Sequence, residues 1–293
     1  MIKQSAFCTL KQVDELSCLH ITHPKFFAEI CLQGAQLTQF KHSQRGELLW
    51  LSPDAHYKKG ASVRGGVPVC WPWFGALEFN PDAVKEAVQS QQAHGFAREL
   101  DWTLENISES ALGVRLTLTL SHDEETLKIW PHEFRLVCQI ELGDNLAMEL
   151  TSQNLSASPM GISQALHTYL PTQDIHGTRV LGAGNGQYID ALDNWQLKKQ
   201  QGAIGFNQEV DRIYLGEHQY QILTPNKQFS LTSNSHSSIV WNPWINKSKR
   251  LSGFPPQGYK NMLCIESANV LSDHLKLAPG TSHTLKMQLS CTD

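Results

Sequence analysis

Two residues of this chain could move protons. His167 lies in an apolar stretch predicted as a strand, on the same face as the small residues Ser163 and Ala165, which leave space beside the imidazole. Glu266 ends a second apolar strand, where a buried carboxylate needs either a partner or a chemical role. If the two faced each other, the carboxylate would raise the pKa of the imidazole, and the imidazolium would keep Glu266 ionised. Such a pair suits acid–base chemistry near neutral pH. The structural alternatives are a core histidine bonded to the backbone and a salt bridge from Glu266 to an arginine.

Two loops each carry an arginine beside glycine. The segment Arg64–Gly75 holds two Trp-Pro or Pro-Trp steps, and its stiff, aromatic backbone should lie against other parts of the protein. The segment Ala93–Arg98 is a second loop of this kind, with Gly95 at its centre. Guanidinium groups match phosphate oxygens, and flat rings beside them suit a sugar that carries an anion. The alternatives are a packed, proline-bent connection and surface arginines without partners.

Further candidates lie in the last third of the chain. Asp211 could accept hydrogen bonds from sugar hydroxyls, or it could be an acidic turn residue. Trp241–Trp244 repeats the Trp-Pro theme, and its rings could stack on a sugar or simply pack. The basic residues of 247–250 could assist phosphate binding or form a solvated surface.

Several chemical classes are disfavoured. The chain has no phosphate-binding Gly-rich motif, no zinc-binding H-E-x-x-H and no G-x-S-x-G nucleophile motif. Its seven cysteines are scattered and include no C-x-x-C, which argues against a disulfide framework or a structural zinc site. We therefore expect neither a metal nor any other cofactor.

Composition restricts the partners and the compartment. The 293 residues carry a net charge of −4, so bulk nucleic-acid binding is not expected. The first ten residues have no sustained apolar core, and no apolar run approaches the ~20 residues needed to cross a membrane. We expect a cytoplasmic protein with a single domain over 1–293, because no linker or repeat divides the chain.

The hydrophobic pattern predicts an all-β fold. Alternation of apolar and polar residues is clearest over 112–121, 134–142 and 146–150, which predicts three strands of an antiparallel meander. Many other short strands follow, and residues 83–92 are the one plausible helix, with Asn80 expected as its cap. The expected architecture is an antiparallel sandwich of sheets with short helices only.

Six segments, taken together and in this order, resemble a known family, the glucose-6-phosphate 1-epimerases or hexose-6-phosphate mutarotases of the galactose-mutarotase-like superfamily. They span most of the chain between 64 and 266: RGGVPVCWPWFG (64–75), HGFAR (94–98), ALHTY (165–169), DRIY (211–214), WNPW (241–244) and MLCIE (262–266).

The resemblance implies a β-supersandwich that interconverts the α and β anomers of hexose 6-phosphates. It implies His167 as general acid and Glu266 as general base. The same resemblance implies Arg64 and Arg98 as ligands of the 6-phosphate, with His94 and Asp211 near the sugar. A monomer acting on a small sugar phosphate, without nucleic acid or membrane, is the expected form.

Two other functions remain open from the sequence. A non-catalytic sugar-binding module would keep the tryptophans and arginines but would have no reason to pair a histidine with a glutamate. A glycoside hydrolase or lyase is the second, but hydrolysis needs two carboxylates across an open groove, and the sequence nominates one.

Overall fold

The computed structural model describes residues 5–217 and 219–292, and its strands all pair antiparallel within their sheets. A five-stranded sheet begins the chain and runs in sequence order. Its strands are β1 (Cys8–Val13), β2 (Leu16–His23), β3 (Phe26–Cys31), β4 (Gln36–His42) and β5 (Gly46–Glu47).

A nine-stranded sheet forms the back layer. Its order is β16 (Ile204–Gly205), β13 (Arg179–Leu181), β18 (Gln219–Leu223), β19 (Gln228–Ser233), β23 (Ser282–Thr292), β10 (Leu146–Asn154), β9 (Phe134–Leu142), β8 (Gly113–Ser121) and β7 (Thr103–Ser110). The run β8–β9–β10 is the meander predicted from the alternating pattern, and that prediction is confirmed.

A seven-stranded sheet carries the candidate site. Its order is β15 (Gln196–Lys199), β14 (Gln187–Asp190), β17 (Val210–Leu215), β20 (Ser237–Asn242), β21 (Met262–Asn269), β12 (Gln164–Pro171) and β6 (Val69–Cys70). A short pair, β11 (Met160–Ile162) and β22 (Leu275–Leu277), stands beside it.

The helices of the described residues are short. The α-helices are α1 (Asp82–Lys85), α2 (Glu124–Ile129) and α3 (Trp244–Ser248), and single 3₁₀ turns span Leu77–Phe79, Ala97–Glu99, Ile175–Gly177, Gly258–Asn261 and Leu271–Asp273. The all-β prediction with short helices is therefore confirmed. In this described part of the chain, no helix is long and apolar enough to cross a membrane.

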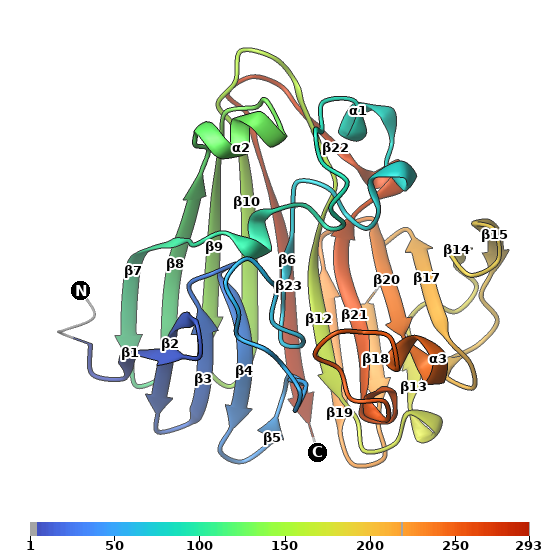
Figure 1. The fold of residues 1–293 in the computed structure, drawn as a ribbon. Coiled ribbons are helices and arrows are strands. Elements are labelled where there is room, and N and C mark those ends of the chain that lie inside the picture. The colour runs from blue at the N-terminus through green and yellow to red at the C-terminus, as the bar shows by residue number, and fades with distance from the viewer. Residues whose placement is uncertain (1–4, 218, 293) are drawn as a thin grey trace.

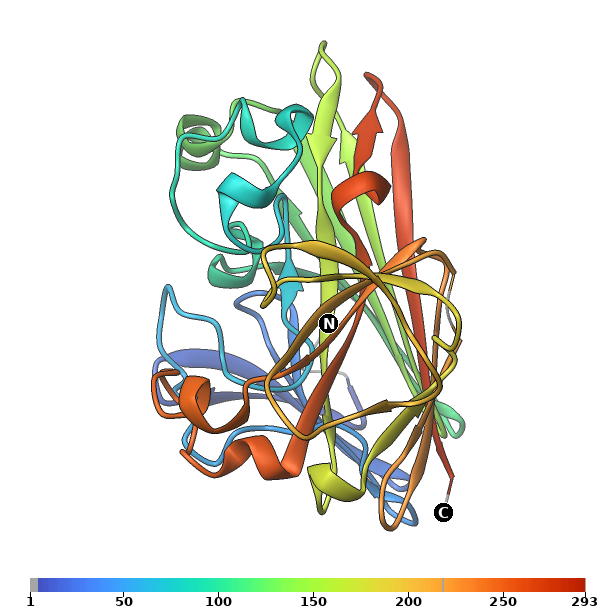
Figure 2. The same ribbon diagram turned by 90° about the vertical axis from the view of Figure 1, so that its right-hand side faces the viewer.

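The sheets pack as two layers. Figures 1 and 2 show the five-stranded sheet in front of one half of the nine-stranded sheet and the seven-stranded sheet in front of the other half. One large cluster of buried apolar side chains fills the space between them, with Phe40 from β4 and Leu118 from β8 among its members. Burying each such side chain stabilises the fold by about 1.5–3 kcal/mol.

Two local predictions are wrong. The helix expected over 83–92 is only the single turn α1. Asn80 does not cap it, because its side-chain amide donates to the carbonyls of Phe74 and Ala76 at 2.8 and 3.0 Å. The predicted strand 48–51 is buried but irregular, since the N–H of Trp50 reaches across to the carbonyl of Tyr169 instead of pairing along a ladder. In the second segment, a contact with a distant part of the chain decides the local backbone.

Candidate active site

The pairing register of two central strands brings the proton-moving residues together. β12 and β21 are neighbours, and His167 is directly opposite Glu266 in their ladder. The imidazole Nε2 lies 3.3 Å from a carboxylate oxygen of Glu266. Both side chains are largely buried, with 12% and 2% of their surface exposed. Side chains at opposite ladder positions on one face are close enough to act on the same small ligand.

Two polar atoms of this pair remain available for a ligand. His167 Nδ1 and Glu266 Oε2 are buried and have no hydrogen-bond partner among the residues that the structure describes. The ring of His167 is held in place by Tyr169, which stacks on it with centroids 4.9 Å apart, and by the edge of Trp241 at 6.1 Å. Buried polar atoms without partners are rare, which makes this pair a candidate for ligand contact.

The electrostatics of the pair differ from the sequence expectation. Burial, with the positive charges of Arg64 and Arg98, lowers the pKa of His167 to about 3. Burial, with the negative charge of Asp211, raises the pKa of Glu266 well above its ordinary value. From the sequence, Glu266 was expected to raise the pKa of His167, and the imidazolium was expected to keep Glu266 ionised. In the protein without a bound substrate, that expectation is wrong. Desolvation penalises both ions, and the arginines add to the penalty on imidazolium, so a neutral imidazole and a protonated carboxyl are favoured.

His94 is placed by a backbone conformation that few residues adopt. Its φ is 65°, and the N–H of Gly75 donates to its Nδ1 at 3.2 Å. Because Nδ1 accepts that bond, the ring proton must be on Nε2, which makes His94 a hydrogen-bond donor. Burial and the charge of Arg98 lower its pKa well below the ordinary value, so the ring stays neutral. The edge of the ring faces His167 at 6.0 Å between centroids.

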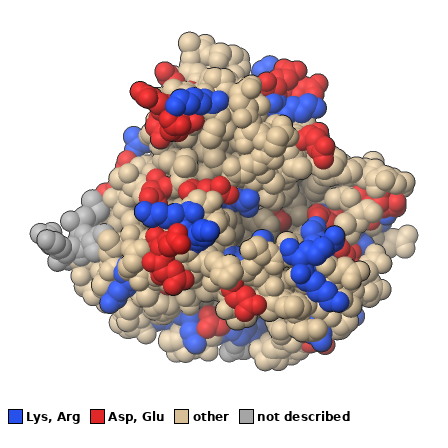
Figure 3. Space-filling view, viewed as in Figure 1, with Lys and Arg blue, Asp and Glu red and all other residues tan. Residues whose placement is uncertain are grey.

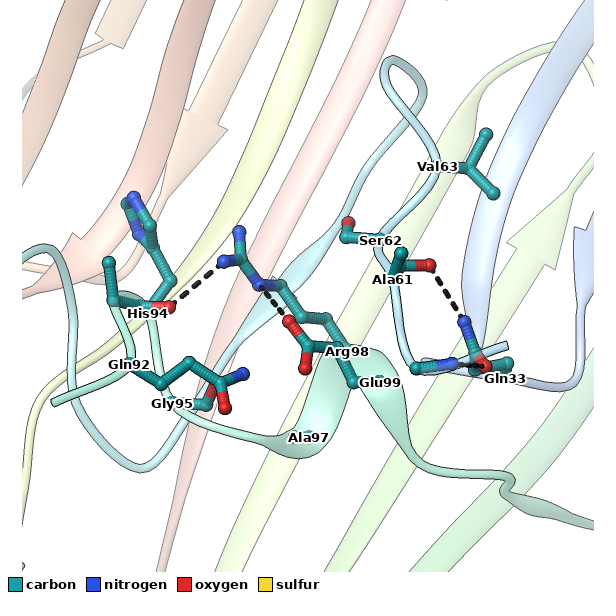
Figure 4. A network of polar contacts seen from close by, with 12 residues as sticks. Gln33, Ala61, Ser62, Val63, Gln92, His94, Gly95, Ala97, Arg98 and Glu99 are labelled. Atoms are coloured by element: carbon teal, nitrogen blue, oxygen red, sulfur yellow. Dashed lines mark hydrogen bonds and ion pairs between the residues drawn. The ribbon is translucent and has the colours of Figure 1, made fainter. Parts of the chain in front are cut away.

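Arg64 is held at the cavity by side chains beneath its loop. Its Nη1 donates to the hydroxyl of Tyr169 at 3.3 Å, while its Nε has no hydrogen-bond partner in the described part of the chain. Gln36 donates to the carbonyls of Val63 and Gly65, on either side of Arg64, at 2.7 and 2.8 Å. Gln33 fixes the preceding turn by donating to the carbonyl of Ala61, as Figure 4 shows. These bonds give the loop a defined position without regular secondary structure.

Arg98 lies at one side of the cavity and is not among the residues that line it. Its Nη2 donates to the carbonyl of Ala93 at 2.9 Å, and its Nε lies 3.8 Å from the carboxylate of Glu99 (Figure 4). The guanidinium lies next to the segment that carries His94, and its charge acts on both His94 and His167. The sequence placed it in the binding site directly, whereas the structure places it just behind the lining.

Asp211 lies on the same wall as the catalytic candidates. It is opposite Trp241 in the β17–β20 ladder, and Lys247 from α3 approaches it to 3.4 Å. Burial raises the pKa of Asp211, although the charge of Lys247 opposes the rise. The ammonium of Lys247 also lies 5.7 Å from the centre of the Trp241 ring. Of the two tryptophans that the sequence left open, Trp241 lines the cavity, and Trp244 packs against Tyr259.

One cavity of about 470 Å³ joins these groups. It is lined by Arg64, His94, His167, Asp211 and Glu266, together with Tyr169, Trp241 and Lys247. Figure 3 shows charges of both signs over this side of the molecule, with basic side chains grouped in the region of α3. The tryptophans of the first loop, Trp71 and Trp73, do not reach the cavity, because both are fully buried in the core.

Sequence reasoning missed the mouth of the cavity. Phe79 and Trp195 line it and stack on each other with centroids 4.3 Å apart. They come from the 3₁₀ turn before α1 and from the β14–β15 hairpin. No pattern in the sequence links these two segments, although an exposed aromatic in a loop is a weak signal for a binding surface.

Comparison with known proteins supports the fold and the family. The same fold is found in a crystal structure described as "a putative mutarotase" from Salmonella typhimurium. That structure superimposes with a TM-score of 0.90 at 29% identity, and the match covers 100% of this chain and 96% of that chain. The family model for aldose 1-epimerase matches residues 17–290. The chain therefore belongs to the aldose 1-epimerase family, and the family resemblance seen in the sequence is confirmed.

Two curated relatives carry a more specific name. The chain is 36% identical, over 88% of its length and 85% of the relative's, to an Escherichia coli (strain K12) protein named "Putative glucose-6-phosphate 1-epimerase". It is 35% identical to a protein of the same name from Cenchrus ciliaris, over 90% of this chain and 80% of that relative.

Proposed function

We propose that this protein interconverts the α and β anomers of a hexose 6-phosphate, with glucose 6-phosphate as the first candidate. The observation that carries the proposal is the opposition of His167 and Glu266 in one cavity, 3.3 Å apart, with one unpartnered polar atom on each. The names of the relatives support the choice of substrate.

The proposed reaction opens and recloses a hemiacetal. Glu266 takes the proton from the C1 hydroxyl, and protonated His167 gives a proton to the ring oxygen as the bond from that oxygen to C1 breaks. The open aldehyde rotates about the C1–C2 bond, and the two residues exchange roles as the ring closes on the other face. The pair holds one proton throughout: on His167 before opening and on Glu266 after it. General acid–base assistance of this kind contributes about 10²–10⁴-fold.

The remaining groups hold the substrate for this step. Arg64 provides a guanidinium group for the 6-phosphate, and its Nε has no hydrogen-bond partner among the described residues. Arg98 lies just behind the cavity lining and adds positive charge there. His94 donates from Nε2 to a sugar oxygen, and Asp211 accepts from a hydroxyl. Holding the phosphate at the far end fixes the sugar while C1 stays free to rotate. All these groups come from one chain, so we also propose that a monomer of one domain is sufficient.

The test is the exchange rate between α- and β-glucose 6-phosphate, measured by NMR with and without the protein. We expect the wild type to accelerate exchange and Glu266→Gln to lose at least a hundredfold of that rate while still binding the substrate. A Glu266→Gln variant with wild-type turnover would remove Glu266 from the reaction. If the wild type binds glucose 6-phosphate but does not accelerate exchange, the protein is a sugar-binding module.

A further inference from the structure

Two cysteines face each other in the five-stranded sheet, away from the candidate site. Cys18 on β2 is directly opposite Cys31 on β3. The neighbouring pair, Ser17 and Leu32, is joined by a backbone hydrogen bond of 2.9 Å, so Cys18 and Cys31 occupy a position between hydrogen-bonded pairs. At such positions the Cα atoms are about 4.5 Å apart, and the side chains come closest together. That separation lies within the range that a disulfide can span.

The two thiols are already in contact and share a small core. Their sulfur atoms are 2.6 Å apart, and both residues are fully buried. They pack with Tyr57 and Val63 in an apolar cluster that is separate from the main core. Val63 immediately precedes Arg64, so this cluster includes the residue next to the candidate phosphate ligand.

A metal ion is a poorer fit for this cluster, although Glu29 lies close to both sulfurs. A tetrahedral zinc site needs four ligands, and among the described residues only these three groups come together here. The carboxylate of Glu29 is also committed elsewhere. It accepts hydrogen bonds from four side chains: Tyr57 at 2.6 Å, Thr38 at 2.7 Å, His20 at 2.8 Å and Gln39 at 3.3 Å.

We propose that Cys18 and Cys31 form a disulfide that joins β2 to β3 near the Arg64 loop. The oxidant is a peroxide. One thiol is oxidised to a sulfenic acid while hydrogen peroxide is reduced and releases water; the second thiol then attacks that sulfur, and its proton leaves with the hydroxyl as another water. The sum is two thiols and one peroxide giving one disulfide and two waters.

The surroundings indicate a slow, persistent bond. The hydrogen bond with Cys18 and burial both raise the pKa of the Cys31 thiol, so little thiolate is present near neutral pH. Hydrogen peroxide is a small oxidant, and burial hinders a bulky thiol reductant more than it hinders the peroxide. Once formed, the bond is shielded from reduction for the same reason.

The test counts thiols in the full-length protein before and after treatment with hydrogen peroxide. We expect seven thiols in the denatured, reduced protein and five after oxidation, with peptide mapping by mass spectrometry placing the new bond between Cys18 and Cys31. Oxidation should raise the Tm by about 5 °C, because the crosslink restricts the unfolded chain.

Cys31→Ala and Cys138→Ala are a matched pair of variants, since both remove a buried thiol. Cys31→Ala should keep all six thiols and an unchanged Tm after oxidation, whereas Cys138→Ala should still lose two. Peptide mapping of the wild type decides the matter even if a variant does not fold. The proposal is overturned if all seven thiols survive, if the bond joins other cysteines, or if the purified protein holds one zinc ion that protects both thiols.

Discussion

The charge state of His167 depends on what surrounds its ring. Arg64 and Arg98 both lower its pKa, and burial adds to their effect. A phosphate group bound at Arg64, with Arg98 just behind the cavity lining, would cancel much of that positive charge and make imidazolium less costly. A 6-phosphate would then do more than anchor the sugar, because it would move the shared proton from Glu266 toward His167, where ring opening requires it.

The first prediction concerns the pH dependence of turnover. Below the pKa of His167 both groups carry protons and the base is lost, so kcat falls on the acid side. Because phosphate raises that pKa from its low value of about 3, the acid limb of kcat for glucose 6-phosphate should lie about one pH unit above that for glucose. Rates of anomer exchange, measured by NMR between pH 3 and 8 for each sugar, give the acid limb for glucose 6-phosphate and the acid limb for glucose.

Arg64→Gln provides the control for this interpretation. Removing one positive charge should move the acid limb for free glucose upward, in the direction that phosphate moves it. If the limbs for both sugars coincide in the wild type, the phosphate acts only as an anchor.

The second prediction concerns the stability cost of Glu266. The pKa of Glu266 is raised in the folded state, so its carboxyl group stays protonated there at pH values above 4.5. In the unfolded chain, the same group ionises above its ordinary pKa of 4.5. The native state is therefore penalised as pH rises through and above 4.5, and no penalty exists at lower pH, where both states are protonated. Glu266→Gln removes the ionisable group, so its Tm relative to wild type should be higher at pH 8 than at pH 4. Differential scanning calorimetry at the two pH values measures this, and an equal difference at both would show that Glu266 ionises normally.

At the scale of elements, strands were predictable and loops were not. The strands around 112–121 and 134–142 show period-2 alternation because one face is buried and the other is solvated. The sequence also nominated His167 and Glu266, but not their register, since register depends on which strands become neighbours. The lowered pKa of the imidazole could not be predicted either, because it follows from burial and from charges on loops distant in sequence.

The loop that carries Arg64 and the loop that carries Arg98 contact each other where Trp71 pairs with Gly95. This contact gives the third prediction. Gly95 has a φ of +67°, and a Cβ there would lie 1.9 Å from the carbonyl oxygen of Trp71. That carbonyl accepts the N–H groups of Phe96 and Ala97, so it cannot easily move away. Gly95→Ala should lower the free energy of unfolding by ~3 kcal/mol or more and should displace the neighbouring His94.

Gly280→Ala separates backbone strain from this close approach. Gly280 has a similar φ of +73°, but apart from its chain neighbours no atom lies within 4 Å of the position that a Cβ would take. It should cost only ~1–2 kcal/mol in urea unfolding and leave the exchange rate unchanged. Equal losses for the two variants would mean that strain alone, and not the contact with Trp71, makes Gly95 necessary.

Over the whole molecule, the site is a sheet wall closed by loops from distant parts of the chain. The seven-stranded sheet supplies His167, Glu266 and Asp211, while the connections around it supply Arg64 and His94. This division places the proton-transfer groups on paired strands and two of the proposed ligand contacts on loops. Figure 1 shows the hairpin β14–β15 at the right-hand edge of the seven-stranded sheet.

The mouth of the cavity gives the fourth prediction. Phe79 and Trp195 are only partly buried, yet they stack across two segments more than a hundred residues apart and both line the cavity. Trp195→Ala should remove an aromatic contact worth ~1 kcal/mol, which corresponds to about a fivefold higher KM for glucose 6-phosphate, with kcat little changed because the proton pair is untouched. Leu197→Ala is the matched control, since Leu197 lies on the same hairpin, is 56% exposed and does not line the cavity. Steady-state kinetics of both variants test this prediction. If the KM for Trp195→Ala is no higher than that for Leu197→Ala, the Phe79–Trp195 stack holds the hairpin against the protein and does not contact the substrate.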